Sequence, residues 1–269
     1  RVGFFVGLCM AFTGIGGVIF NPIGTALINA GAEGWRTAYL VFGVVILVGT
    51  LPFTTLVVRS RPADKGLLPY GADEADESAP SATDGASPEP DDSMEASAAM
   101  RTSAFFALAA FSGLITLNQT IYQYLAGYAQ SFAQTLPAVA AASGIVASAA
   151  MAGQAIGKVL LGVVNDRSVK LGAVMGIGAG VAGVTLMWLL PGQLALLLVG
   201  AFLFGIAYAE TTVQTPLLVR TVFGSADYTN VYSCVSMVGS LMGTFAAVFW
   251  SIVVDSAGGY PLMFALGYV

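Results

Sequence analysis

Two ionisable residues lie deep inside apolar stretches of this chain. Lys158 comes seven residues before the polar segment that starts at Asn165, and Glu210 comes ten residues before Arg220. If both stretches are helices, a rise of 1.5 Å per residue places the charges about 10 Å and about 15 Å from the helix ends. A charged side chain in hydrocarbon costs at least about 2.5–3.5 kcal/mol, so such residues typically mark solute or proton pathways. Lys158 is suited to attract an anion, and Glu210 is suited either to pair with Lys158 or to bind a proton.

Polar side chains accompany both charges on the same helix faces. Residues four apart project from one side of a helix, and such polar pairs occur on three of the apolar stretches. Asn and Gln can also simply join helices by hydrogen bonds, and Lys158 could extend along its helix to the polar edge. Three polar stripes with two opposite charges nevertheless indicate a shared aqueous cavity. We predict Glu210 as a coupling residue and the following substrate-binding residues: Lys158, Asn118, Gln119, Tyr122, Gln123, Gln154 and Gln214.

These residues lie on some of seven apolar runs, each long enough to cross a bilayer. A hydrocarbon core about 30 Å thick needs about 20 residues of helix. The predicted spans are 3–29, 37–58, 103–129, 137–164, 171–190, 194–219 and 231–254, and an eighth run begins near Tyr260. The chain is 57% hydrophobic and 9% charged, with a mean hydropathy of +0.81, which excludes an ordinary soluble globule. The predicted fold class is therefore all-α, a polytopic membrane protein made of helical bundles.

The cations between the spans are unevenly distributed. If every run crosses the bilayer, Arg36 lies alone on one side. The other side holds Arg1, Arg59, Arg61, Lys65, Arg101, Arg167, Lys170 and Arg220. Cytoplasmic loops are enriched in Lys and Arg, so that side is predicted to be cytoplasmic. We expect a multi-pass protein of the cell membrane.

The net charge of −5 originates in one segment. Residues 73–95 hold nine acidic residues and no basic one, within a stretch rich in Pro, Ala and Ser. Such a segment cannot bury enough apolar surface to offset its ordering entropy. We predict a disordered cytoplasmic linker over 61–100, either a simple tether or a binding or regulatory tail. It divides two helices at 1–60 from a bundle of six at 101–269.

Several stretches resemble the major facilitator superfamily of transporters. The first two spans and the start of the linker contain GIGGVIFNPIGTALI, GWRTAYLVFGVVILVGTLPF and RSRPADKGLLPYG. These are similar to the fifth helix, the sixth helix and the central loop of that family. The stretch GKVLLGVVNDRSVK is similar to its Gly-x-x-x-Asp-Arg signature. The resemblance implies that the chain covers approximately helices five to twelve and is truncated at both ends.

The resemblance also implies roles for particular residues. Gly162, Asp166 and Arg167 occupy signature positions and would form a gating latch, the alternative being a plain charged turn. Lys158 occupies a position that is often cationic in monocarboxylate and oxalate/formate type members. In the first span, small residues and a proline would form the interface between two bundles, the alternative being ordinary close packing. These residues are Gly14, Gly17, Pro22 and Gly24.

We therefore expect a secondary active transporter that works by alternating access between two bundles. The expected solute is a small organic anion, such as a monocarboxylate or dicarboxylate, coupled to a proton or a counter-solute. The alternatives are a drug or sugar exporter of the same fold, in which Lys158 is structural, and a non-transporting membrane scaffold. The chain has no His and no converging carboxylates, so no enzyme activity, metal or cofactor is expected. Its scattered cations argue against nucleic acid as a partner, and we expect a monomer.

Overall fold

The computed structural model describes residues 2–56, 66, 94–225 and 227–268. All regular elements within these residues are helices, and seven of them are long and apolar enough to cross a membrane. The predicted fold class, an all-α polytopic membrane protein, is confirmed. Most of the predicted linker, namely residues 61–65 and 67–93, lies outside the described residues, so its disorder stays a prediction.

The long helices match the predicted spans to within a few residues. They are α1 (Val2–Asn29), α2 (Gly34–Leu56), α5 (Ser103–Gln119), α8 (Ser143–Asn165), α9 (Val169–Leu189), α10 (Leu194–Phe223) and α11 (Tyr228–Asp255). A 3-10 turn, η2 (Thr120–Tyr124), continues α5 into α6 (Leu125–Ser131), and these three form one span. The shorter helices are α4 (Ala96–Ala99), α7 (Pro137–Ala141) and α12 (Gly259–Leu266).

One predicted span differs in detail from the structure. The run at 137–164 is two helices, since α7 ends at Ala141 and α8 begins at Ser143. Pro137 occupies the first turn of α7, where its missing N–H removes no helical hydrogen bond. The apolar composition continues through the break between α7 and α8, so hydrophobicity alone could not reveal it.

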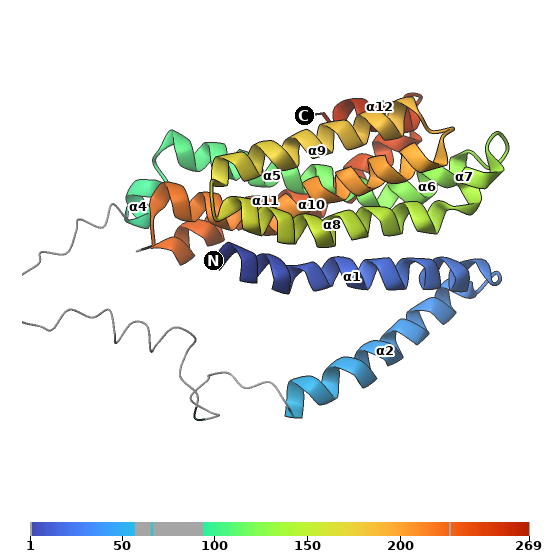
Figure 1. The fold of residues 1–269 in the computed structure, drawn as a ribbon, viewed down its shortest axis with the longest axis horizontal. Coiled ribbons are helices and arrows are strands. Elements are labelled where there is room, and N and C mark those ends of the chain that lie inside the picture. The colour runs from blue at the N-terminus through green and yellow to red at the C-terminus, as the bar shows by residue number, and fades with distance from the viewer. Residues whose placement is uncertain (1, 57–65, 67–93, 226, 269) are drawn as a thin grey trace, which may run out of the picture. The chain divides into compact units, whose positions relative to one another are not determined.

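The chain divides into two compact units. One contains residues 1–25 and 92–269, and the other contains residues 26–91. In the first unit α10 packs against both α8 and α9, and α5 packs against α11 (Figure 1). The predicted division near residues 60 and 100 stays a prediction, because it falls largely outside the described residues.

Glycines allow the central helices of the first unit to approach closely. A Cβ atom at Gly153 of α8 would collide with the carbonyl oxygen of Phe202, and one at Gly205 of α10 would collide with that of Ala150. Small residues permit such backbone contact between membrane helices, where dispersion and packing replace the hydrophobic effect. These contacts hold α8, which carries Lys158, and α10, which carries Glu210, close together.

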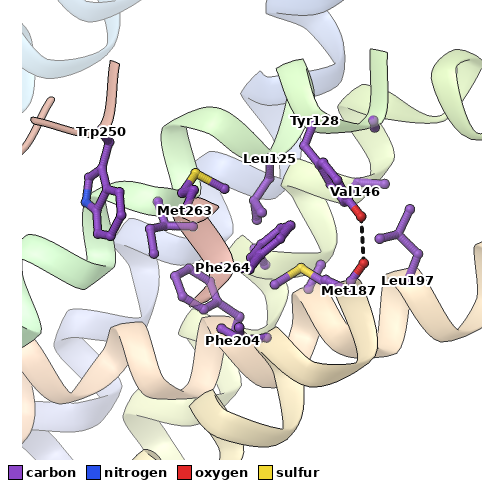
Figure 2. Packing of buried hydrophobic residues seen from close by; sticks show 14 of the residues in the cluster. Leu125, Tyr128, Val146, Met187, Leu197, Phe204, Trp250, Met263 and Phe264 are labelled. Atoms are coloured by element: carbon purple, nitrogen blue, oxygen red, sulfur yellow. Dashed lines mark hydrogen bonds between the residues drawn. The ribbon is translucent and has the colours of Figure 1, made fainter. Parts of the chain in front are cut away.

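An apolar cluster packs α6, α9, α10, α11 and α12 together. The ring of Phe264 lies edge-on against that of Tyr128 with a centroid separation of 4.9 Å, and the Tyr128 hydroxyl donates to the Met187 carbonyl oxygen at 2.7 Å (Figure 2). The Trp250 indole N–H donates to the Leu117 carbonyl oxygen at 2.7 Å. Because these buried polar atoms are paired, the cluster is stabilising at little desolvation cost.

The segment that precedes α5 is anchored to the loop between α10 and α11. The amide of Met94 donates to the Phe223 carbonyl oxygen at 3.0 Å, and that of Ala96 donates to the Asp227 carboxylate at 2.9 Å. Ala99 of α4 is fully buried in an apolar cluster with residues of α10 and α11. Packed structure therefore begins inside the stretch that we assigned to the linker from its composition.

Candidate functional site

A polar cavity of about 480 Å³ lies among α1, α5, α8, α10 and α11. It is lined by Met10, Thr13, Ser112, Thr116, Gln119, Met151, Gln154, Lys158, Tyr208, Thr211, Thr212, Thr215, Tyr232, Ser236, Gly239 and Ser240. All of these except the two methionines and the glycine are polar. A polar hollow of this size between membrane-length helices is typical of a solute site rather than of a packing defect.

Lys158 supplies the positive charge of the cavity. Its side chain is only 2% exposed, and its ammonium donates to the Thr13 hydroxyl at 2.5 Å and to the Met10 carbonyl oxygen at 3.2 Å. The Thr13 hydroxyl in turn donates to the Met10 carbonyl oxygen at 2.8 Å. The charge on α8 is therefore held by two oxygen atoms of α1.

Lys158 does not extend toward the polar end of its helix. The backbone of Lys158 lies against Gly7 of α1, whereas its ammonium reaches Met10 and Thr13, farther from the start of α1. The two helices are antiparallel, since Gly144 of α8 contacts Thr25. The ammonium consequently points into the bundle, as expected for a helical side chain that leans toward the N-terminus of its helix.

Glu210 occupies a different hollow. It is 1% exposed, and within the described part of the chain neither carboxylate oxygen has a hydrogen-bond partner. A Cβ atom at Gly176 of α9 would overlap its carboxylate. This second hollow, of about 180 Å³, is also lined by Asn118 and Tyr268. The single shared cavity expected for Lys158 and Glu210 is thus replaced by two hollows.

The orientation of α10 about its axis explains why Lys158 and Glu210 lie in different hollows. Tyr208, Thr211 and Thr215 line the cavity, whereas Ala207 and Glu210 line the second hollow. Adjacent residues on a helix point about 100° apart, because 3.6 residues complete a turn. The alternative of a Lys158–Glu210 ion pair is also not realised, since the described residues contain one ion pair, between Arg36 and Glu33.

The other predicted substrate-binding residues are divided among several environments. Gln119 and Gln154 line the cavity together with Lys158. Tyr122 lies outside its lining and accepts a hydrogen bond from the Asn21 amide at 2.7 Å. Gln123 is exposed. Spacing alone placed these residues on shared helix faces but did not fix which face turns toward the cavity.

Gln214 joins three helices instead of lining the cavity. Its amide donates to the Val169 carbonyl oxygen at 2.6 Å, and its carbonyl oxygen accepts from the Asn165 amide at 2.9 Å. The side chain is fully buried where α8 ends and α9 begins. In this structure Gln214 is a packing residue, because both of its polar atoms are already satisfied by protein.

Sequence reasoning missed the hydroxyl groups that form most of the cavity wall. The α5 positions are Ser112, Thr116 and Gln119, and the α11 positions include Tyr232, Ser236 and Ser240. Their spacing of three or four residues puts each set on one helix face. The spacing of these residues could therefore have indicated a polar helix face. Ser and Thr commonly bond to their own helix backbone, however, so their spacing alone is weak evidence for a cavity.

The family comparison supplies the decisive observation for the class of protein. A sequence model described as Major Facilitator Superfamily matches residues 1–149, which is more than half of the chain. The chain belongs to the major facilitator superfamily. Members are secondary transporters that bind small-molecule solutes within the bilayer, so this membership points to a multi-pass transporter rather than an enzyme. A comparison with curated proteins found no match.

The predicted interface helix of this superfamily member contacts the C-terminal helices through its glycines. A Cβ atom at Gly14 would lie 2.7 Å from the Ala155 amide nitrogen, and one at Gly17 would overlap the Met151 side chain. Pro22 lies inside α1, and Gly24 is buried. A domain-interface role for α1 stays a prediction, but this face does lie directly against α8.

The predicted gating motif of the superfamily lies at the turn between α8 and α9. Gly162 is buried in the last turns of α8, Asp166 is the C-cap of that helix, and Arg167 is exposed. The amide of Leu171 donates to the Ser168 hydroxyl at 3.3 Å, which caps the start of α9. The motif residues are close together, and their function as a latch stays a prediction.

Proposed function

We propose that this protein transports small organic anions and that Lys158 attracts the anion into the cavity. Among the described residues that line the cavity, Lys158 is the charged one and none is a carboxylate. Two of the three ammonium N–H groups are used by Thr13 and Met10, which leaves one to donate to a solute. The observation that supports the proposal most strongly is this buried ammonium, held without a carboxylate beside an open polar volume.

The contact of Lys158 with α1 also supports alternating access. The ammonium connects α8 to α1, the predicted interface helix. An anion that binds the ammonium would compete with the Met10 carbonyl oxygen and the Thr13 hydroxyl for the same positive charge. Binding would then weaken an α1–α8 contact that has to change when the site opens to the other side.

We further propose that Glu210 couples transport to a proton. A buried carboxylate without a hydrogen-bond partner is costly when ionised and is stabilised by taking up a proton. The proton would bind in the second hollow, on a different face of α10 from the solute. Movement of α10 relative to α9 at Gly176 would link the two events. Exchange against a counter-solute is the alternative form of coupling.

The proposal is tested with Lys158→Gln and Lys158→Arg in the complete protein reconstituted in liposomes. Lys158→Gln is expected to reduce carboxylate uptake roughly 10- to 100-fold, because a lost charge-assisted hydrogen bond is worth about 1.5–3 kcal/mol. Lys158→Arg keeps the charge and is expected to retain measurable uptake. Lys170→Gln, which removes an exposed charge near the start of α9, is the control. Unchanged carboxylate uptake by Lys158→Gln would make Lys158 structural, as expected for a drug or sugar exporter of this fold.

A further inference from the structure

The threonines of the cavity have little capacity left to donate hydrogen bonds. The hydroxyl of Thr116 donates to the Ser112 carbonyl oxygen at 2.7 Å, and that of Thr211 donates to the Tyr208 carbonyl oxygen at 2.9 Å. A hydroxyl group has one donor hydrogen and two acceptor lone pairs. Once the hydrogen is used within the helix, the oxygen atom can only accept from a molecule in the cavity.

A further hydroxyl in the cavity wall has no partner. Thr215 lines the cavity, is 3% exposed, and has a hydroxyl without a hydrogen-bond partner among the described residues. A buried polar group left in this state destabilises the protein unless a solute or water pairs with it. Thr215 is on the same face of α10 as Thr211, one turn apart, but its hydroxyl keeps its hydrogen and can donate as well as accept.

The cavity therefore combines a cationic donor with a wall that both donates and accepts, since Thr116 and Thr211 can only accept whereas the serine hydroxyls and the Gln119 and Gln154 amides can also donate. A carboxylate satisfies Lys158 but cannot pair with the Thr116 and Thr211 oxygen atoms, because it donates nothing. An alkyl chain leaves those oxygens unpaired. An ammonium group on the solute would donate, but in the part of the chain that the structure describes no acidic residue lines the cavity to balance its charge. Hydroxyl groups on an anionic solute can donate to the threonine oxygen atoms and can also accept from the donors in the wall, without adding a positive charge.

We propose that the solute is a polyhydroxylated carboxylate of the sugar-acid type, with its carboxylate at Lys158 and its hydroxyl groups donating to Thr116 and Thr211. The volume of about 480 Å³ falls within the range of about 300–1,000 Å³ for small-molecule sites and accommodates several carbons with their hydroxyls. This inference rests on the proposed function, because Lys158 provides the anion contact.

The first test compares three probes that differ in one property each. Binding of gluconate, hexanoate and sorbitol to the complete purified protein is measured by titration calorimetry. Gluconate is expected to bind at least tenfold more tightly than either hexanoate or sorbitol. Hexanoate binding as tightly as gluconate would overturn the inference about hydroxyl groups while leaving anion binding intact. Sorbitol binding as tightly as gluconate would instead contradict the proposed function, and failure of all three to bind would overturn the inference.

The second test uses valine substitutions that keep the side-chain shape and remove the acceptor. Thr116→Val and Thr211→Val are expected to weaken gluconate binding about tenfold each and to leave hexanoate binding unchanged. Thr211→Ser, which retains a hydroxyl, is expected to restore binding. The matched control is Thr221→Val on the same helix, since Thr221 is exposed and donates to the Leu217 carbonyl oxygen at 2.8 Å outside the cavity. Equal weakening of gluconate and hexanoate by Thr211→Val would mean a structural effect and would overturn the inference.

Discussion

Lys158 and Glu210 differ in how the surrounding protein compensates their charge. The Lys158 ammonium has two oxygen partners on α1, whereas both Glu210 oxygens are unpartnered within the described residues. Because an unpaired buried charge is costly, the protein compensates the charge of Lys158 and leaves a charge on Glu210 uncompensated. This difference supports separate tasks for the two side chains, attraction of a solute anion and uptake of a proton.

The residue-scale prediction concerns Glu210→Gln, which mimics the neutral acid. We expect the variant to exchange labelled solute across the membrane at a rate within a few-fold of the wild type. We also expect it to lose accumulation driven by a pH gradient, because no proton can leave the site. Counterflow and pH-jump uptake in the same liposomes distinguish the two activities. A variant that still accumulates solute in response to a pH gradient would show that Glu210 is not the coupling residue.

Helix positions were predictable from the sequence, but helix rotations were not. The length of the apolar runs predicted the seven membrane-spanning helices, because each crossing of a bilayer needs about 20 apolar residues. The polar spacing on α10 correctly put Glu210 and Gln214 on one face, yet that face packs on α9 instead of lining the cavity. Which face turns inward depends on glycine contacts such as Gly153 with the Phe202 backbone, and such partners lie far apart in the sequence.

The element-scale prediction concerns the packing of α1 on α8. Gly14→Leu would place a side chain against backbone atoms of Met151 and Ala155, where a Cβ atom alone already lies 2.7 Å from two of them. We expect solute counterflow to fall more than tenfold, because α1 can no longer approach the Lys158 ammonium. Gly16→Leu is the matched control, since nothing lies within 4 Å of a Cβ atom at that position. Equal transport by the two variants would contradict a functional contact between α1 and α8.

At the scale of the whole molecule, composition predicted an all-α membrane protein, and the structure has seven helices long and apolar enough to cross a membrane. The resemblance of several stretches indicated the major facilitator superfamily, and the family model matches residues 1–149, which include the first two spans. The cavity itself could not be predicted in full, because five helices from distant parts of the chain contribute to its wall. The sequence revealed its single charge and its two amides, whereas its hydroxyl groups emerged only when the helices were brought together.

The central claim is that a positively charged, water-accessible cavity lies among these membrane helices, and it can be measured without knowing the solute. Ser236→Cys places a thiol in the cavity wall, after Cys9 and Cys234 are replaced by serine in the complete protein. The rates of modification by anionic and cationic methanethiosulfonates of similar size are then compared.

We expect the anionic reagent to be favoured by more than about tenfold, since a nearby unit charge attracts an anion and repels a cation by about 1–2 kcal/mol each at intermediate dielectric. Lys158→Gln should abolish that preference without removing the reactivity of the thiol. A thiol at position 236 that does not react, or a preference that persists in Lys158→Gln, would contradict the account.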